Sequence, residues 1–221
     1  MTTTQLLKRD LFGSVSALDH SEEPHTRVVL RDTRDARWWL KPLARHLARR
    51  EARALSALEG TRGVPSLLEH TKFTLTRQWI DGEPMQRARP TSPEYYRLAS
   101  HLLRTLHSHG VVHNDLAKET NWLVAPSGEP ALVDFQLACC THRHRRGAWF
   151  RALAHDDLRH MLKHKRTYLP ERLTLREKAI LAKPSLVSRV WMRTGKRAYL
   201  LITRRVLGWA DREGAGDRAP R

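Results

Sequence analysis

The chain contains the stretch LHSHGVVHNDLAKETN at residues 106–121 and the stretch ALVDFQ at residues 131–136. In each stretch an apolar run, which predicts a short strand, borders polar residues. Asp115 lies in the first polar segment and Asp134 ends the second strand, so a hairpin would bring both carboxylates to one rim of a cleft. Phosphoryl transfer needs such a pair, because one acid orients the acceptor hydroxyl while the other holds the Mg²⁺ that bridges nucleotide phosphates. The alternative is that the two aspartates only cap turns.

These stretches resemble the protein-kinase superfamily motifs L-H-x-x-G-x-x-H-R-D-L-x-x-x-N and D-F-G. They are most similar to the small bacterial and RIO-type branch, which includes lipopolysaccharide-core sugar kinases. The resemblance implies an ATP- and Mg²⁺-dependent phosphotransferase with Asp115 as the catalytic base. It also implies that Asp134 and Asn121 bind the metal, and that His113 braces the catalytic loop.

Three departures from the family pattern affect this assignment. The catalytic loop is one residue longer than usual, so either it bulges or Glu119 or Thr120 takes the metal-facing place. Gln136 replaces the glycine of D-F-G, which removes backbone freedom at that position. No A-P-E sequence follows, and only about twenty residues separate Gln136 from the next helical stretch. We therefore expect no long regulatory activation segment.

Glu51 lies on the apolar stripe of a helix predicted over residues 36–58. An inward-facing carboxylate needs a cation, and in the kinase pattern that cation is a strand lysine that grips the nucleotide phosphates. Arg31 ends a strand that reads like V-A-I-K and precedes Glu51 by 20 residues, whereas Lys41 precedes it by ten and lies inside the predicted helix. The spacing favours Arg31. The alternative is that Glu51 turns outward to one of the neighbouring arginines Arg45, Arg49 and Arg50.

Other residues of the N-terminal part are expected to contact the nucleotide. The phosphate-covering loop of the family is glycine-rich, but residues 11–14 offer only Gly13. Trp79 and Ile80, at the end of the last N-terminal strand, are also assigned to nucleotide binding. The Asp81-Gly82-Glu83-Pro84 turn that follows is the expected boundary between two lobes.

The order of predicted elements indicates the α+β class, as a two-lobed, protein-kinase-like fold. Residues 1–80 should form a small antiparallel-sheet N-lobe with one helix, and residues 81–84 the hinge. Residues 85–211 should form a C-lobe with a helix over 92–109, the catalytic hairpin and basic helices, followed by a loose end at 212–221. Asp156 and Asp157 are expected at the start of one of these helices. Either one of them caps the helix and the other accepts hydrogen bonds from the catalytic-loop backbone, or both only cap the helix.

Composition and charge limit the class of protein and its partners. The chain has 221 residues, of which 40% are hydrophobic, and a net charge of +17, with 21 Lys and Arg against 7 Asp and Glu in residues 142–221. This length and hydrophobic fraction are enough for a folded core, which argues against a disordered chain. No apolar run approaches the roughly 20 residues that a membrane-spanning helix needs. The adjacent Cys139 and Cys140 make no disulfide framework. We expect a cytoplasmic protein that can lie peripherally on the inner face of the membrane.

The phosphate acceptor is the least determined feature. A serine/threonine protein kinase is the first choice, and a sugar kinase acting on lipopolysaccharide core is the second, suggested by the basic C-terminal half. A kinase-like scaffold without chemistry is the third. The expected partner is a phosphate-acceptor protein or a phosphorylated glycolipid, with an anionic membrane surface met through the basic half. Nucleic acid is not an expected partner.

Overall fold

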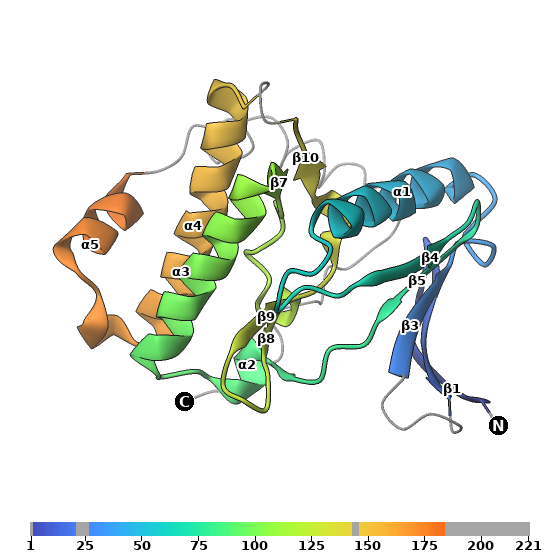
Figure 1. Cartoon of the computed structure of the whole chain (residues 1–221), viewed down its shortest axis with the longest axis horizontal. Coiled ribbons are helices and arrows are strands. Elements are labelled where there is room, and N and C mark those ends of the chain that lie inside the picture. Colours follow the sequence, from blue (N-terminus) through green and yellow to red (C-terminus); the bar gives the residue numbers. More distant parts are fainter. Residues whose placement is uncertain (1, 21–26, 143–145, 184–221) are drawn as a thin grey trace, which may run out of the picture.

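The computed structural model describes residues 2–20, 27–142 and 146–183, and it has the predicted α+β architecture (Figure 1). A five-stranded antiparallel sheet carries helix α1, and a mainly helical part lies beside it. The strand order of the sheet is β1-β2-β3-β5-β4. Its strands are β1 (Thr2–Asp10), β2 (Gly13–His20), β3 (Arg27–Asp32), β4 (Leu67–His70) and β5 (Thr74–Gln78).

Helix α1 (Lys41–Ala57) is shorter than predicted, because residues 36–40 form turns instead. Pro42 lies in its first turn, where the missing N–H of proline costs no hydrogen bond. The predicted apolar stripe was also wrong at its start, since Trp39 and Leu43 are exposed. The buried face is instead formed by small residues together with Glu51 and Leu55, namely Ala44, Ala48, Ala52 and Ala54.

The helical part is built on α3 (Pro93–Ser108), α4 (Ala148–Tyr168) and α5 (Leu175–Ala182). Helix α3 agrees with the prediction, and the Ser92 side chain caps it by accepting from the Glu94 N–H. The second half of the expected hinge forms strand β6. The short elements are β6 (Glu83–Pro84), α2 (Met85–Ala88), β7 (Val111–Val112), η1 (Glu119–Asn121), β8 (Trp122–Val124), β9 (Pro130–Leu132), η2 (Phe135–Leu137), β10 (Cys139–Cys140) and η4 (Pro170–Arg172).

One hydrophobic cluster joins the end of α1 to the helical part. Leu55 of α1, Leu106 of α3 and Phe135 of η2 are all fully buried in it. The loop after α1 is attached to the same part, because the Leu132 N–H donates to the Gly63 carbonyl at 2.8 Å. A Cβ atom at Gly63 would lie 2.8 Å from the Pro130 carbonyl oxygen, so this close approach requires glycine.

Helix α4 begins eight residues before Asp156, so neither Asp156 nor Asp157 opens a helix as predicted. Within the part of the chain that the structure describes, no helix is long and apolar enough to cross a membrane. The predictions for residues 184–211 and for the loose end at 212–221 lie outside the described residues.

Candidate active site

The β8–β9 hairpin brings the two predicted acidic segments together. Trp122 pairs with Leu132, so the residue before β8 and the residue after β9 are neighbours. The Val133 N–H donates to the Asn121 carbonyl at 3.1 Å. The Asn121 Nδ2 donates to the Asp115 carboxylate at 3.1 Å and to the Asp115 main-chain oxygen at 2.9 Å. Asn121 therefore links the loop of Asp115 to the strand that leads into Asp134.

Two cations act on these carboxylates. Lys118 Nζ lies 2.9 Å from Asp115 Oδ2, and Arg31 Nη2 lies 3.9 Å from Asp134 Oδ1. Burial acts to raise the pKa of Asp134, but the Arg31 charge, a hydrogen bond from Gln136 Nε2 (2.7 Å) and the Lys118 charge together hold it below its usual value. Asp134 is therefore ionised at neutral pH.

The backbone of Asp134 has the left-handed conformation, with φ 66°. Asn114 of the catalytic loop also has a positive φ, at 64°. Non-glycine residues adopt this region at an energetic cost, and they do so mainly where surrounding contacts impose it, often at functional sites. The loops around both predicted acids thus have conformations that the fold imposes.

His113 and Asp157 hold the catalytic loop in place. The fully buried His113 donates from Nε2 to the Val133 carbonyl at 3.0 Å, which suits the predicted bracing role. Asp157, also buried, accepts the main-chain N–H groups of His113 at 2.8 Å and Asn114 at 2.9 Å. His107 Nε2 lies 3.2 Å from the same carboxylate. The prediction that one of the two aspartates bonds the loop backbone is confirmed for Asp157.

Glu51 is fully buried between two arginines. Arg31 Nε lies 3.2 Å from its Oε2 and Arg77 Nε lies 3.3 Å from its Oε1. The prediction that Arg31 is its cation is therefore confirmed, and Arg77 is a second one. Lys41 is the first residue of α1, and ten residues of helix separate it from Glu51 by about 15 Å along the axis.

Arg50, the neighbour of Glu51 on α1, contacts the segment that follows Asp134. Its guanidinium donates to the carbonyl oxygens of Leu137 (2.9 Å) and Ala138 (2.9 and 3.1 Å). Helix α1 therefore makes two contacts near the site. Its Glu51 positions Arg31, and its Arg50 positions the segment that follows Asp134.

Glu119 is not brought to the two acids. Its carboxylate accepts from the Tyr168 hydroxyl at 2.6 Å and lies 3.8 Å from His164 Nδ1, both on α4. Asn121, rather than Glu119, reaches Asp115. Glu119 and Asn121 are the first and last residues of the short helix η1.

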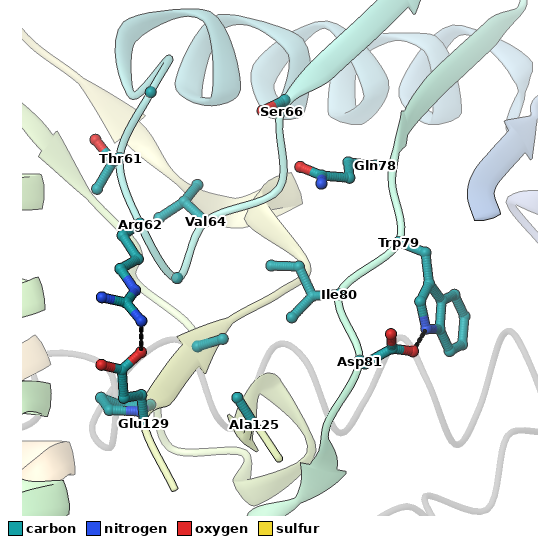
Figure 2. A pocket seen from close by; sticks show the side chains of 14 residues that line it. Thr61, Arg62, Val64, Ser66, Gln78, Trp79, Ile80, Asp81, Ala125 and Glu129 are labelled. Carbon is teal, nitrogen blue, oxygen red and sulfur yellow. Dashed lines mark hydrogen bonds and ion pairs between the residues drawn. The ribbon is translucent and has the colours of Figure 1, made fainter. Parts of the chain in front are cut away.

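The remaining predicted nucleotide residues lie at two other places. Gly13 closes the β1–β2 turn with φ 126°, and a Cβ atom there would lie 2.1 Å from the Asp32 carbonyl oxygen, so the turn itself requires glycine. Trp79 and Ile80 line a cavity of about 440 Å³ between the loop after α1, the end of β5 and the β8–β9 turn (Figure 2). Neither acid belongs to this lining. The nucleotide-binding roles of these three residues stay predictions.

The donor set around Asp134 suits Mg²⁺. The ion prefers oxygen ligands and is usually held by one or two carboxylates plus phosphates and water. The Asp134 side chain is 36% exposed, and the Asn121 amide, whose Nδ2 donates to Asp115, carries an oxygen of the type that Mg²⁺ accepts as a ligand. No group of three or more His, Cys, Asp and Glu side chains that could hold a metal occurs in residues 2–20, 27–142 and 146–183. A site completed by nucleotide phosphates needs no such group.

Three site residues did not emerge from the sequence. Arg77 shares its strand face with the buried Leu75, and this two-residue alternation could have revealed an inward-pointing arginine. Lys118 lies within the catalytic-loop motif, but its position in the sequence does not show that its side chain points toward Asp115. The sequence suggests Arg50 only as an outward partner of Glu51, and no local signal shows that it reaches residues almost ninety positions away.

Comparison with known families agrees with this geometry. The RIO domain profile matches residues 21–177, which is most of the chain. The chain belongs to the RIO domain family. Membership implies a two-lobed, kinase-like fold and ATP-dependent phosphoryl transfer of the protein-kinase-like type.

A curated relative of this RIO domain is the probable bifunctional tRNA threonylcarbamoyladenosine biosynthesis protein of Methanoculleus marisnigri. It is 35% identical over 92 residues, which are 41% of this chain and 16% of the relative. The chain therefore spans about one sixth of the length of that protein, and the relative's activity as a whole is not carried over to this chain.

Proposed function

We propose that this RIO domain transfers the γ-phosphoryl group of ATP to a serine or threonine hydroxyl of a protein. The observation that carries the proposal is the linkage of Asp115 to the strand before Asp134 through Asn121. The linkage supports the proposal because it joins the loop of Asp115, the proposed base, to the strand before Asp134, the proposed metal-binding acid, and phosphoryl transfer needs both groups.

Each residue has a distinct role in the proposed reaction. Asp115 accepts a hydrogen bond from the acceptor hydroxyl and takes its proton as the hydroxyl oxygen bonds to the γ-phosphorus. The bond from the γ-phosphorus to the β–γ bridging oxygen breaks in the same transfer, and ADP leaves. Asp134 and Asn121 would hold Mg²⁺, which neutralises charge on the nucleotide phosphates. Arg31 presents its guanidinium fork to the phosphates, and Glu51 keeps that fork in the cleft.

Two features near the acids support the proposal. Lys118, 2.9 Å from Asp115, keeps a positive charge where phosphoryl oxygens would gather. The low pKa of Asp134 keeps its carboxylate ionised for a metal at neutral pH. A scaffold without chemistry would need neither feature, which favours an enzyme over a kinase-like binding protein.

The segment between η2 and α4 supports a second acceptor class. Only residues 137–147 separate Gln136 from α4, fewer than the sequence predicted, and Arg50 and the β7–β10 pair hold the beginning of this segment in place. A segment this short offers little surface on which to dock an extended peptide. A sugar hydroxyl of a phosphorylated glycolipid is therefore the alternative acceptor.

Incubation of the purified chain with γ-labelled ATP and Mg²⁺ separates these possibilities. Protein and lipopolysaccharide fractions are assayed separately, with the Asp134→Asn variant as the blank. Label on serine or threonine would support the proposal. Label confined to the glycan would replace it by the sugar kinase, and no transfer to either fraction would favour the scaffold.

A further inference from the structure

Large apolar side chains are exposed at the N-terminal end of α1. Trp38 is 82% exposed, Trp39 43% and Leu43 45%. Trp39 and Leu43 are one helical turn apart, because the Lys41 N–H already donates to the Arg37 carbonyl in the i to i−4 pattern. These three residues are called the tryptophan tip below. Exposed apolar residues gathered in this way usually mark an interaction site.

The turn between β4 and β5 lies beside the N-terminal end of α1 (Figure 1). The Thr33 N–H, in the loop before the tip, donates to the Phe73 carbonyl at 2.8 Å. The Arg45 guanidinium of α1 lies 4.7 Å from the centre of the Phe73 ring, and Lys72 Nζ lies 5.3 Å from it. Arg45 of α1 and Lys72 of the β4–β5 turn thus both lie at one aromatic ring.

The charge around the tryptophan tip is positive. Arg37 and Lys72 are exposed, and Lys41 and Arg45 are partly exposed. Two acids lie nearby: Asp32 pairs with Arg34, and Asp35 accepts from the Ser14 hydroxyl at 2.9 Å and keeps its negative charge. The basic residues around the tip still outnumber this one unneutralised acid. The basic residues that flank the tip are Arg37, Lys41, Arg45 and Lys72.

We infer that the tryptophan tip docks on an anionic membrane surface. Indole rings prefer the membrane–water interface, because they combine an apolar ring with a polar N–H. Lysine and arginine side chains beside them are attracted to anionic headgroups. The tip is a projecting turn and helix end, not a groove, and Leu43 cannot stack on a base, so the surface fits a lipid interface better than a nucleic acid strand.

This docking would bring the membrane close to the β1–β2 turn. The Arg37 N–H donates to the Leu11 carbonyl at 3.3 Å, and the Asp35–Ser14 hydrogen bond joins the same two loops. The turn that contains Gly13 is therefore attached to the membrane-docking loop. The inference itself needs no catalytic activity and is independent of the proposed acceptor.

Vesicle flotation with the full chain tests the inference. We expect binding to phosphatidylcholine vesicles that contain about 30% phosphatidylglycerol, and about tenfold weaker binding to phosphatidylcholine alone. The double variant Trp38→Ala/Trp39→Ala should lower binding to the anionic vesicles by about tenfold or more. Trp149→Ala is the matched control, because this tryptophan is 65% exposed but lies on α4, and it should bind as the unchanged chain does.

Two charge-reversal variants show whether vesicle binding depends on the basic residues beside the tryptophan tip or only on the net charge of the chain. Arg37→Glu/Lys72→Glu should weaken binding several-fold more than Arg104→Glu/Arg151→Glu, which changes the net charge equally at exposed positions on α3 and α4. Equal losses from both pairs, unchanged binding of the double tryptophan variant, or no vesicle binding at all would overturn the inference. Loss of single-stranded oligonucleotide binding in the double tryptophan variant, with vesicle binding unchanged, would instead assign the tip to nucleic acid.

Discussion

The Nε atom of Arg31 lies 3.2 Å from Oε2 of Glu51, and this ion pair joins strand β3 to helix α1. The same guanidinium approaches Asp134 at 3.9 Å, and Arg77 approaches the other Glu51 oxygen at 3.3 Å. Val29 pairs with Arg77 and Arg31 pairs with Leu75, so the two arginines are diagonal neighbours on adjacent strands. Removing one partner from such a buried cluster leaves uncompensated charge, which costs about 3–5 kcal/mol for an isolated pair and less where a second partner remains.

We expect Arg31→Ala to weaken nucleotide binding by about tenfold or more, because the guanidinium beside Asp134 is the group that can reach nucleotide phosphates. Lys41→Ala should change the Kd for ATP by less than about twofold, since Lys41 lies at the far end of α1. Isothermal titration with Mg²⁺ and ATP measures both. The opposite order would transfer the phosphate-gripping role to Lys41.

Replacing Asp115 or Asp134 by asparagine should impair different steps. Asp115→Asn should leave ATP binding intact and lower phosphoryl transfer by about a thousandfold or more, because it removes the base. Asp134→Asn should abolish the Mg²⁺-dependent part of nucleotide binding. Rapid-quench assays and titrations with and without Mg²⁺ report these two effects. Equal and mild losses from both variants would contradict the assignment.

Arg50→Ala should lower transfer by about tenfold, because the segment after Asp134 loses its three hydrogen bonds to α1. Arg49→Ala is the matched control, since Arg49 is the exposed neighbour on the same helix. Arg50→Lys should restore part of the activity. If Arg49→Ala and Arg50→Ala behave alike in transfer and in Mg²⁺-dependent binding, Arg50 has no positioning role.

Asp157→Ala should destabilise the fold by about 3 kcal/mol, because two buried main-chain N–H groups of the catalytic loop lose their acceptor. Urea unfolding measures the change. Asp156→Ala, one position earlier on α4 and less buried, is the comparison and should cost about 1 kcal/mol or less. Similar losses for the two variants would mean that Asp157 does not hold the loop.

Burial, with the charge of Lys163 nearby, lowers the pKa of His160 to about 4, although Asp156 and Asp157 act in the opposite direction. Between this value and the ordinary pKa of about 6.5, the unfolded chain binds the proton more readily than the folded chain. Stability should therefore fall as the pH drops from about 6.5 to about 4, and His160 should contribute about 2 kcal/mol to this loss.

His160→Gln should flatten the stability profile in that interval, and urea unfolding at several pH values would show it. His101→Gln, on the exposed face of α3, should leave the slope unchanged. The lowered pKa of Asp134 acts in a separate interval, below pH 3.8, where protonation of the carboxylate removes its contribution. An unchanged slope between pH 4 and 6.5 in His160→Gln would contradict the prediction.

Local patterns were sufficient for much of the secondary structure. Alternation and turn residues located β2 and β3, and the serine–proline start with a following Gly110 located α3. The start of α1 was predicted wrongly, because the spacing of Trp39 and Leu43 imitates a buried stripe. The buried face of α1 instead carries small residues such as Ala44 and Ala48, which allow close packing. Which face of the helix is buried depends on the elements that pack against it.

The sequence alone predicted the hairpin with its two acids, and it favoured Arg31 as the cation for Glu51. The hairpin follows from apolar runs that flank polar residues, whereas the choice of Arg31 rests on its spacing and on the resemblance to the kinase pattern. Only the tertiary structure decided that Arg77 shares Glu51, that Arg50 reaches Leu137 and Ala138, and that Glu119 turns to α4. These contacts depend on strand register and helix packing, which bring together residues far apart in the chain, and no spacing along the chain encodes the direction of a single polar side chain.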